Sequence, residues 1–214
     1  MAMTDILLAL VPLFVVVDPL ASIGLYLGLT QRNTAAERNA IAVKAALFAS
    51  CVLLVFAFLG RQLLDYLGIE LYSLQVAGGI LLTIIGLNML KEGEEPGHHD
   101  VDADALPVHT GGSTSALPKR HDPSLVPLGL PMLAGPGAIS LVIVQTTSFG
   151  FPTIGVAIAL TMAAALAILL IASKAQRFIG ENGARVITRI MGLLTVAFAV
   201  QYIFDGVNGW LATR

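Results

Sequence analysis

The 214-residue chain has little charge, since only 12% of its residues are Asp, Glu, Lys or Arg. Soluble domains carry about 25% charged residues, so a soluble fold of this chain would have too few charged side chains for its surface. Hydrophobic residues make up 56% of the sequence, and the mean hydropathy is +0.83. The composition therefore predicts a polytopic membrane protein whose surroundings are the lipid bilayer.

The chain also lacks most of the groups from which catalytic and metal sites are built. Its one cysteine, Cys51, lies in an apolar run, which excludes a disulfide framework and a thiolate metal site. The four histidines all fall between positions 98 and 121, outside the apolar runs, and no nucleotide-phosphate loop occurs. We expect no enzyme activity, no cofactor, no metal and no nucleic-acid partner.

Six apolar runs are each long enough to cross the hydrocarbon layer, which takes about 20 residues. They cover residues 6–30, 40–60, 71–90, 124–149, 153–173 and 190–211. Residues 91–123 are rich in Gly, Asp, Glu, His, Ser and Pro, which is typical of a flexible, solvent-exposed linker. The sequence thus predicts an all-α fold with three-helix units at 1–90 and 124–214, joined by a linker at 91–123.

The basic residues predict the orientation of these spans. Ten of the 12 Lys and Arg residues fall at the ends of the runs that share a side with the linker. Only Arg61 and Arg214 fall on the other side. Because cytoplasmic loops carry the excess of Lys and Arg, we expect a cytoplasmic linker and both termini outside.

Asp18-Pro19 interrupts the first apolar run. Along a helix, Asp18 would lie about 18 Å from Ile6, near the centre of a layer about 30 Å thick. A carboxylate at that depth costs at least about 2.5 kcal/mol and marks a functional-site hypothesis. Because Asp is a good N-cap and Pro suits the first helical position, we expect a helix that stops before Asp18 and restarts at Pro19. Capping alone is the alternative role for Asp18.

A similar break lies in the fourth run. Val126-Pro127-Leu128 leads to Gly135-Pro136-Gly137, as Val11-Pro12-Leu13 leads to Asp18-Pro19. Two half-helices that begin at Pro19 and Pro136 would direct unpaired N–H groups toward a common cavity. A packed helix that the prolines merely kink is the alternative.

The third and sixth runs also match each other. Gly79-Ile80-Leu81 corresponds to Gly192-Leu193-Leu194, and Asn88 corresponds to Gln201 at the same offset. Since each unit has three spans, an odd number, the two units would insert in opposite orientations. The pattern predicts six transmembrane helices arranged as two inverted repeats with broken first and fourth helices, which is typical of secondary transporters.

These breaks predict a midplane site for a zwitterion. Gly135, Pro136 and Gly137 lack bulky side chains, so backbone N–H groups there could approach a carboxylate. Asp18 would suit an ammonium group or a coupling cation. Burial and the adjacent helix end change the proton affinity of Asp18 in opposite directions, so proton coupling, sodium coupling and uncoupled movement all stay open.

Four further residues are candidates for lesser contacts with the substrate. Ser22 and Ser140 lie one helical turn into the restarted helices, and Asn88 and Gln201 would contribute if they lie at cavity depth. The alternative for Asn88 and Gln201 is a hydrogen bond between helices. We expect Gly78-Gly79 to be a close-packing contact.

Three stretches together resemble the MarC family of six-span bacterial inner-membrane proteins. They are Val17-Asp18-Pro19 with Tyr26-Leu27-Gly28-Leu29-Thr30, Ala77-Gly78-Gly79-Ile80-Leu81-Leu82 with Asn88-Met89-Leu90, and Pro127-Leu128-Gly129-Leu130-Pro131-Met132-Leu133-Ala134-Gly135-Pro136-Gly137-Ala138-Ile139. The third is the most specific, and the resemblance covers nearly the whole chain except the linker. It departs at Ala21-Ser22, where members commonly carry Gly-Asn.

The resemblance implies a transporter or exporter of small neutral amino acids in a bacterial inner membrane. Efflux of another small solute and a non-transporting scaffold role stay open as alternatives. Small residues on several helix faces are compatible with a homo-oligomer but do not specify one.

Overall fold

The computed structural model describes residues 3–20, 22–30, 33–92 and 133–213. The described chain is helical and contains no strand, which confirms the all-α prediction. Its elements are α1 (Met3–Val17), α2 (Ser22–Leu29), α3 (Ala35–Leu67), α4 (Leu71–Glu92), α5 (Pro136–Phe149) and α6 (Phe151–Ala212). Residues 91 and 92 of the predicted linker belong to α4. The rest of the linker and the start of the fourth run lie outside the described residues.

Four segments of the described chain are long and apolar enough to cross a membrane. They are Ala35–Leu67, Leu71–Lys91, Phe151–Ala172 and Thr188–Ala212. Helices α1 and α5 are apolar but shorter, because each adjoins one of the predicted breaks. The count of six spans stays a prediction.

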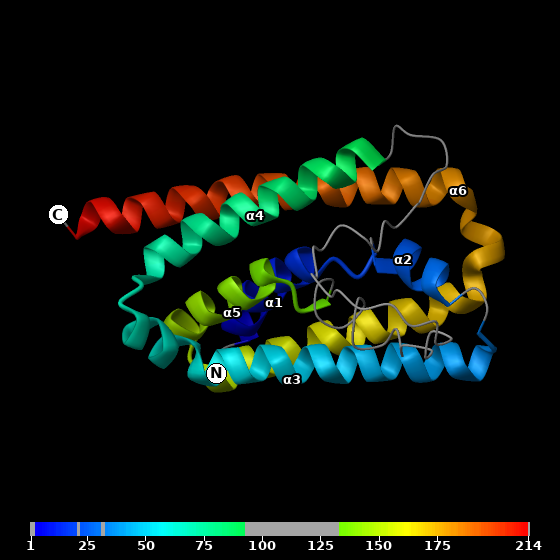
Figure 1. Ribbon diagram of the computed structural model, residues 1–214, viewed down its shortest axis with the longest axis horizontal. Helices are drawn as coiled ribbons and strands as arrows, with labels where there is room; N and C mark the ends of the chain where they lie inside the picture. The colour runs from blue at the N-terminus through cyan, green and yellow to red at the C-terminus, as the bar shows by residue number, and fades with distance from the viewer. Residues whose placement is uncertain (1–2, 21, 31–32, 93–132, 214) are drawn as a thin grey trace, which may run out of the picture.

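The fifth and sixth apolar runs form one continuous helical element, α6. Figure 1 shows α6 running along one side of the molecule, turning near its middle and returning on the other side. The two runs had been predicted as separate segments. The connecting stretch, 174–189, contains no proline, so every residue in it keeps the N–H group that the helix requires.

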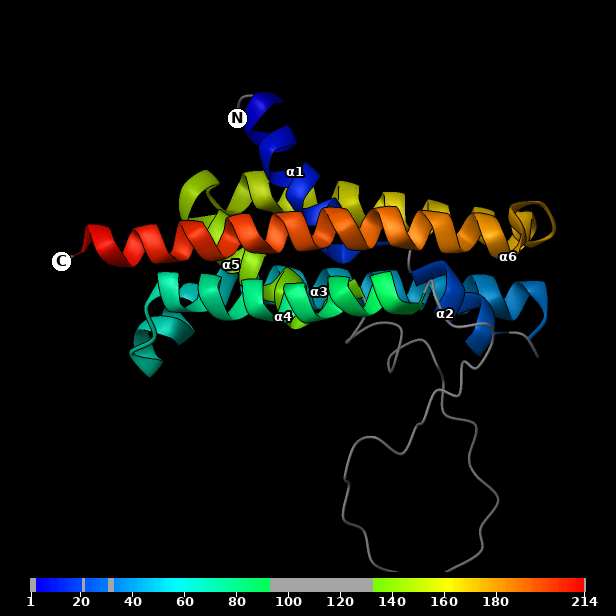
Figure 2. The same ribbon diagram turned by 90° about the horizontal axis from the view of Figure 1, so that it is seen from above.

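The long segments form two side-by-side, antiparallel pairs. One pair is α3 with the first half of α6, and the other is α4 with the second half of α6 (Figures 1 and 2). The shorter helices α1, α2 and α5 lie between the pairs. Helix α1 packs mainly against α6, whereas α5 packs mainly against α3 and α4. Each short apolar helix thus packs on long helices from the other half of the chain.

Glycines bring the backbones of α4 and α6 into direct contact. A Cβ on Gly86 would lie 2.9 Å from the carbonyl oxygen of Gly192, and a Cβ on Gly79 would lie 2.9 Å from that of Ala199. Small residues favour such approach in membranes, where van der Waals packing drives helix association. Gly192 follows Gly79 by 113 residues, and Ala199 follows Gly86 by 113 residues. The two contacts are therefore equivalent: each joins a position in one half to the counterpart, in the other half, of the position seven residues away.

Local sequence signals fix the ends of α3. Thr34 and Glu37 form a capping box: the Glu37 N–H donates to Thr34 Oγ1 at 3.4 Å, and the Thr34 N–H donates to Glu37 Oε2 at 2.9 Å. At the other end Gly68 adopts a left-handed φ of 68°, which glycine tolerates at no steric cost. These caps extend α3 beyond the predicted run 40–60 at both ends.

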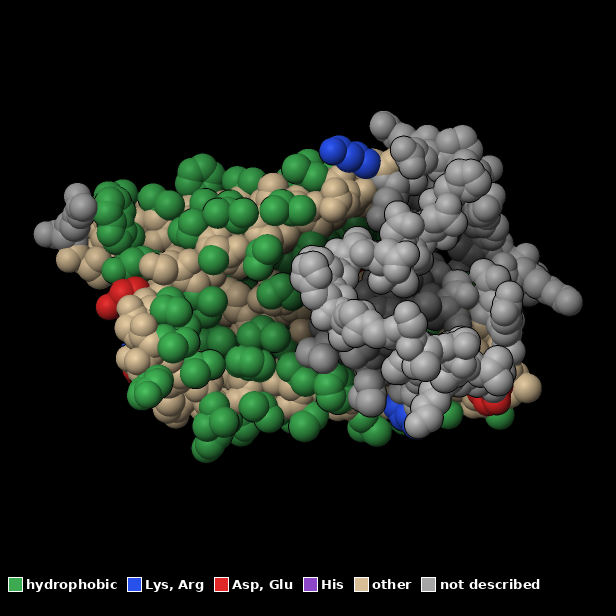
Figure 3. Space-filling view, in the orientation of Figure 1, with side chains coloured by type: hydrophobic (Ala, Val, Ile, Leu, Met, Phe, Trp, Pro, Cys, Tyr) green, Lys and Arg blue, Asp and Glu red, His purple; other side chains and the backbone are tan. Residues whose placement is uncertain are grey.

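The outer surface of the bundle is apolar. Figure 3 shows hydrophobic side chains over most of the described part of one face, with the few charged side chains near its edges. Exposed residues include Leu47, Phe58, Ile84, Leu193 and Phe204. Such a surface needs lipid around it, as the composition predicted.

Candidate functional site

The first helix break is centred on Asp18. Helix α1 ends at Val17, so the predicted stop before Asp18 is confirmed. Asp18 has a φ of 45°, and it is the one residue other than glycine with a positive φ in the part of the chain that the structure describes. Asp and Asn are the residues other than glycine that most readily adopt this left-handed conformation.

The restart of the helix differs from the prediction. Helix α2 begins at Ser22, not at Pro19. The Ser22 N–H and Ser22 Oγ both donate to the Asp18 carbonyl oxygen, at 3.2 and 3.0 Å. The left-handed Asp18 redirects the chain, and Pro19 and Leu20 form the turn that follows. Ser22 thus contacts the backbone of the break.

The Asp18 carboxyl group is nearly buried, since the residue is only 8% exposed. Pro19, next to it, is also buried. Burying a carboxylate is costly unless it is hydrogen-bonded or paired, and backbone strain of this kind clusters at functional sites. The strained conformation and the buried acid at one position support the interpretation of this break as a site.

The second break has the predicted helix start. Helix α5 begins at Pro136, with Gly135 as an extended N-cap at φ −64° and ψ 165°. As the N-cap residue, Gly135 has no side chain to accept from the first N–H groups of α5, and no side chain in the described ranges caps this end. A Cβ on Gly137 would lie 2.5 Å from Leu82 Cδ2, so glycine is required for α5 to approach α4 here.

Ser140 joins three helices. Its Oγ donates to the Leu74 carbonyl oxygen on α4 at 3.0 Å and lies 3.4 Å from the Tyr202 Oη on α6. A Cβ on Gly78 would lie 2.5 Å from Ser140 Oγ, which confirms the predicted close-packing role of Gly78-Gly79. Ser140 therefore holds the start of α5 against α4 and α6.

Tyr202 is a residue of this region that the sequence did not single out. It is 4% exposed, and its ring stacks on that of Phe198 at a centroid distance of 5.7 Å. A tyrosine inside an apolar run is a signal that was available, because a buried hydroxyl needs a hydrogen-bond partner.

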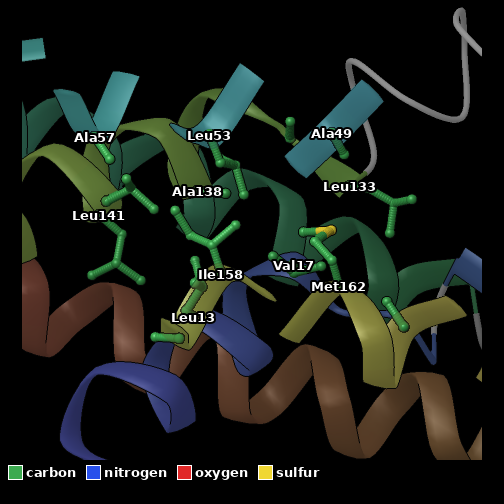
Figure 4. Close-up of a cluster of buried hydrophobic side chains, with 14 of the residues drawn as sticks. Leu13, Val17, Ala49, Leu53, Ala57, Leu133, Ala138, Leu141, Ile158 and Met162 are labelled. Carbon is green, nitrogen blue, oxygen red and sulfur yellow. The ribbon is translucent and has the colours of Figure 1, made fainter. Parts of the chain in front are cut away.

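Both breaks border the same hydrophobic core. Val17 and Leu13 of α1 belong to one buried cluster with Leu133 and Ala138, which flank the second break. Figure 4 shows these side chains within one buried cluster, together with Ile158 of α6. Residues beside the two breaks, far apart in the sequence, are thus brought together.

Asn88 and Gln201 are not brought to this region. Both side chains are exposed on the outer surface of the bundle. Gln201 Nε2 donates to Asp205 Oδ1 at 2.9 Å, within α6 itself. Asn88 lies two residues beyond Gly86, a turn of about 200° around the helix, so it faces away from the α4–α6 contact.

Three buried polar side chains were also not predicted. Gln145 Nε2 donates to the Ala9 carbonyl oxygen at 3.3 Å, which ties α5 to α1 near Pro12. Within the described chain, Gln145 Oε1, Thr161 Oγ1 and Thr195 Oγ1 are buried without a hydrogen-bond partner. Such groups are costly in a membrane interior, and they mark further buried polar positions in the bundle.

In the described ranges, no group of three His, Cys, Asp or Glu side chains could hold a metal ion. The four linker histidines lie outside these ranges. The polar groups found around the breaks are serine, tyrosine and a single carboxyl group, together with backbone N–H groups. Such groups can bind and orient a polar solute by hydrogen bonds and charge.

Comparison with known proteins agrees with this architecture. Residues 3–211 match the model of the MarC family integral membrane proteins. The inner membrane protein YhgN of Escherichia coli strain K12 is 30% identical over 98% of this chain and 99% of its own length. The membrane protein YvbG of Bacillus subtilis strain 168 is 33% identical over 93% of this chain and 92% of its own.

A membrane protein of Aquifex aeolicus strain VF5 is similar to the same extent, at 33% identity over 95% of this chain and 92% of its own length. No solved structure matches the chain. The family model covers both helix breaks and the four long apolar segments as far as residue 211. The chain therefore belongs to the MarC family of integral membrane proteins.

Proposed function

We propose that this protein is a secondary transporter or exporter of small neutral amino acids. Its substrate would bind near the midplane, between the two helix breaks. The observation that carries the proposal is the joining of the breaks by one core, in which Val17 lies with Leu133 and Ala138. Non-helical backbone at membrane depth is tolerated where it lines a cavity or is buried in protein.

The contact between α4 and α6 supports an inverted repeat. The offset of 113 residues between the halves maps the Gly86–Gly192 contact onto the Gly79–Ala199 contact. The packing of α1 on α6, and of α5 on α3 and α4, supports it too, because each of these short helices contacts the other half of the chain. Inverted repeats with broken helices are a common plan of secondary transporters, whose substrates bind at the repeat interface.

The two breaks would bind opposite ends of a zwitterion. Within the described residues, the α5 N-terminus has no side-chain cap, so its N–H groups and its partial positive charge suit a carboxylate. Asp18 carries the negative charge that an amino acid's ammonium group, a proton or a sodium ion requires. The small residues Gly135 and Gly137 and the nearby apolar core favour a substrate with a small, uncharged side chain.

The relatives and the distribution of charge support a proposed location. YhgN is named an inner membrane protein, and we infer the same location for this chain. The excess of Lys and Arg on the linker's side supports a cytoplasmic linker and outside termini.

Uptake into proteoliposomes tests the proposal. Labelled glycine and alanine are offered to the wild type and to Asp18→Asn, with and without imposed proton or sodium gradients. Asn also accepts a left-handed backbone, so this variant loses the charge and keeps the geometry of the break. Asp205→Asn, which changes an exposed carboxylate on α6, is the matched control.

We expect saturable uptake by the wild type and by Asp205→Asn, and none by Asp18→Asn. Uptake that Asp18→Asn leaves unchanged, including its ion dependence, would remove Asp18 from the site. No uptake of any small amino acid by well-folded protein would overturn the proposal and favour efflux of another solute or a scaffold role.

A further inference from the structure

A hollow with both apolar and polar lining lies at the end of α3, away from both helix breaks. It has a volume of about 400 Å³ and opens between the end of α3, the end of α5 and the start of α6. Its polar lining comprises Arg61, Gln62, Asp65, Thr146 and Thr147. No role proposed for the breaks uses any of these residues.

The two charged side chains of this hollow are available to a ligand. Arg61 Nε lies 3.9 Å from Asp65 Oδ2, and the two side chains are 65% and 68% exposed. An exposed ion pair of this kind contributes about 0–1 kcal/mol. Exchanging it for contacts with a bound zwitterion therefore costs little.

The two threonines add hydrogen-bond acceptors. Thr146 Oγ1 donates to the Val142 carbonyl oxygen and Thr147 Oγ1 to the Val144 carbonyl oxygen, each at 2.7 Å. Because each hydroxyl proton is already used within α5, the oxygen lone pairs remain to accept. With Asp65, they form a set of acceptors beside the guanidinium of Arg61.

A shallow apolar groove continues from this hollow along the face of α3. Its volume is about 450 Å³, and it shares Phe58 with the hollow. The groove runs from Leu59 back to Leu47, a distance of about 18 Å at 1.5 Å per residue. Half of the hydrocarbon layer is about 15 Å. The groove is thus as long as the acyl region of one leaflet.

We propose that the hollow and the groove together hold one zwitterionic phospholipid with a primary ammonium headgroup. The phosphate binds Arg61, and the ammonium group donates to Asp65 and the threonine oxygens. One acyl chain lies along the apolar groove past Phe58. A choline headgroup has no N–H to donate, and a glycerol headgroup has no positive charge for Asp65, so the site discriminates against both.

Lipid retention measured by native mass spectrometry tests this assignment. The full chain, stripped of lipid in detergent, is offered phosphatidylethanolamine, phosphatidylcholine or phosphatidylglycerol with identical acyl chains. We expect one phosphatidylethanolamine to be retained in preference to the other two. Arg61→Gln and Asp65→Asn should each weaken retention about tenfold, the loss of one charge-assisted hydrogen bond. Lys91→Gln, an exposed change at the end of α4, should leave it unchanged.

Cys51 offers a second measurement, because it is the chain's one cysteine and lines the apolar groove. A small fluorophore attached there should be quenched by phosphatidylethanolamine with brominated acyl chains, at lower concentrations than by brominated phosphatidylcholine. Equal retention of the three lipids, with equal quenching by the two brominated lipids, would overturn the proposal. Release of the lipid by millimolar glycine would overturn it too, because the hollow would then bind a soluble zwitterion.

Discussion

The two helix breaks interrupt the first apolar run of each half of the chain, but different residues and contacts stabilise them. At the first break, Asp18 takes a left-handed backbone, and its carbonyl oxygen accepts two hydrogen bonds from Ser22. At the second break, Gly135 stays extended without a side-chain cap, and Ser140 bonds to other helices. The first break is stabilised locally, whereas the second depends on its neighbours.

This difference predicts different sensitivities. Changes at the second break should disturb the packing of α5 against α4 and α6. Changes at the first break should act through the local backbone and through the charge of Asp18. Stability and transport can therefore be separated between the breaks by substitution.

The largest expected effect on stability is at Gly137. In Gly137→Ala the new Cβ would lie 2.5 Å from Leu82 Cδ2 and 2.8 Å from Leu82 Cγ. Leu82 is itself buried, so relief requires its neighbours to move. We expect a loss of about 1–3 kcal/mol, measured as a lower midpoint of thermal unfolding in detergent.

Gly155→Ala is the control for that substitution. Its Cβ would meet only Leu54 Cδ2, at 4.0 Å, an ordinary contact. Since Ala forms helix better than Gly by about 1 kcal/mol, this variant should unfold at the same temperature or higher. Equal destabilisation of both variants would mean that close packing at the second break is not what makes Gly137 necessary.

The backbone of Asp18 predicts the next effect. Asp18→Val and Asp18→Asn both remove the charge, but only Asn readily adopts a positive φ. Asp18→Val should be less stable than Asp18→Asn by about 1–2 kcal/mol, the cost of a left-handed residue. Thermal unfolding of the two variants in parallel gives the difference. If they unfold together, the break does not depend on a left-handed residue at this position.

The two serines give a smaller and more direct comparison. Ser140→Ala should lose about 1 kcal/mol of stability, because its hydrogen bond to Leu74 joins two helices. Ser22→Ala should lose less, because Ser22 and Asp18 lie four residues apart, and their hydrogen bond survives when the helices separate. Unfolding in increasing denaturant measures both, and a larger loss for Ser22→Ala would reverse the distinction drawn between the breaks.

Much of this architecture follows from local sequence signals. The long helices were predictable because hydropathy needs no knowledge of neighbours, and α5 begins at Pro136 because proline and glycine act locally. The restart at Ser22 was missed because it depends on the left-handed Asp18, which composition does not encode. Tyr202 was missed because its role requires Ser140, 62 residues away.

Asn88 and Gln201 show a different limit. Their common offset predicted matching positions in the two halves but not the helix faces on which the side chains lie. A signal for the face was present in the spacing of small residues: Gly79 and Gly86 are seven apart, as are Gly192 and Ala199. Seven residues are nearly two helical turns, so these residues form the contact stripe, and both candidate amides lie two positions beyond it.

Gln145 should show the smallest change in stability. Gln145→Met keeps most of the side chain's volume, removes a 3.3 Å hydrogen bond to Ala9 and removes a buried oxygen without a hydrogen-bond partner in the described chain. The loss of a long hydrogen bond and the relief of an unsatisfied oxygen offset each other. The free energy of unfolding should therefore change by less than about 0.5 kcal/mol. Transport measured on the same variant then decides what Gln145 does. Unchanged uptake would make it a link between α1 and α5, whereas lost uptake at unchanged stability would extend the solute's route from the breaks along α5.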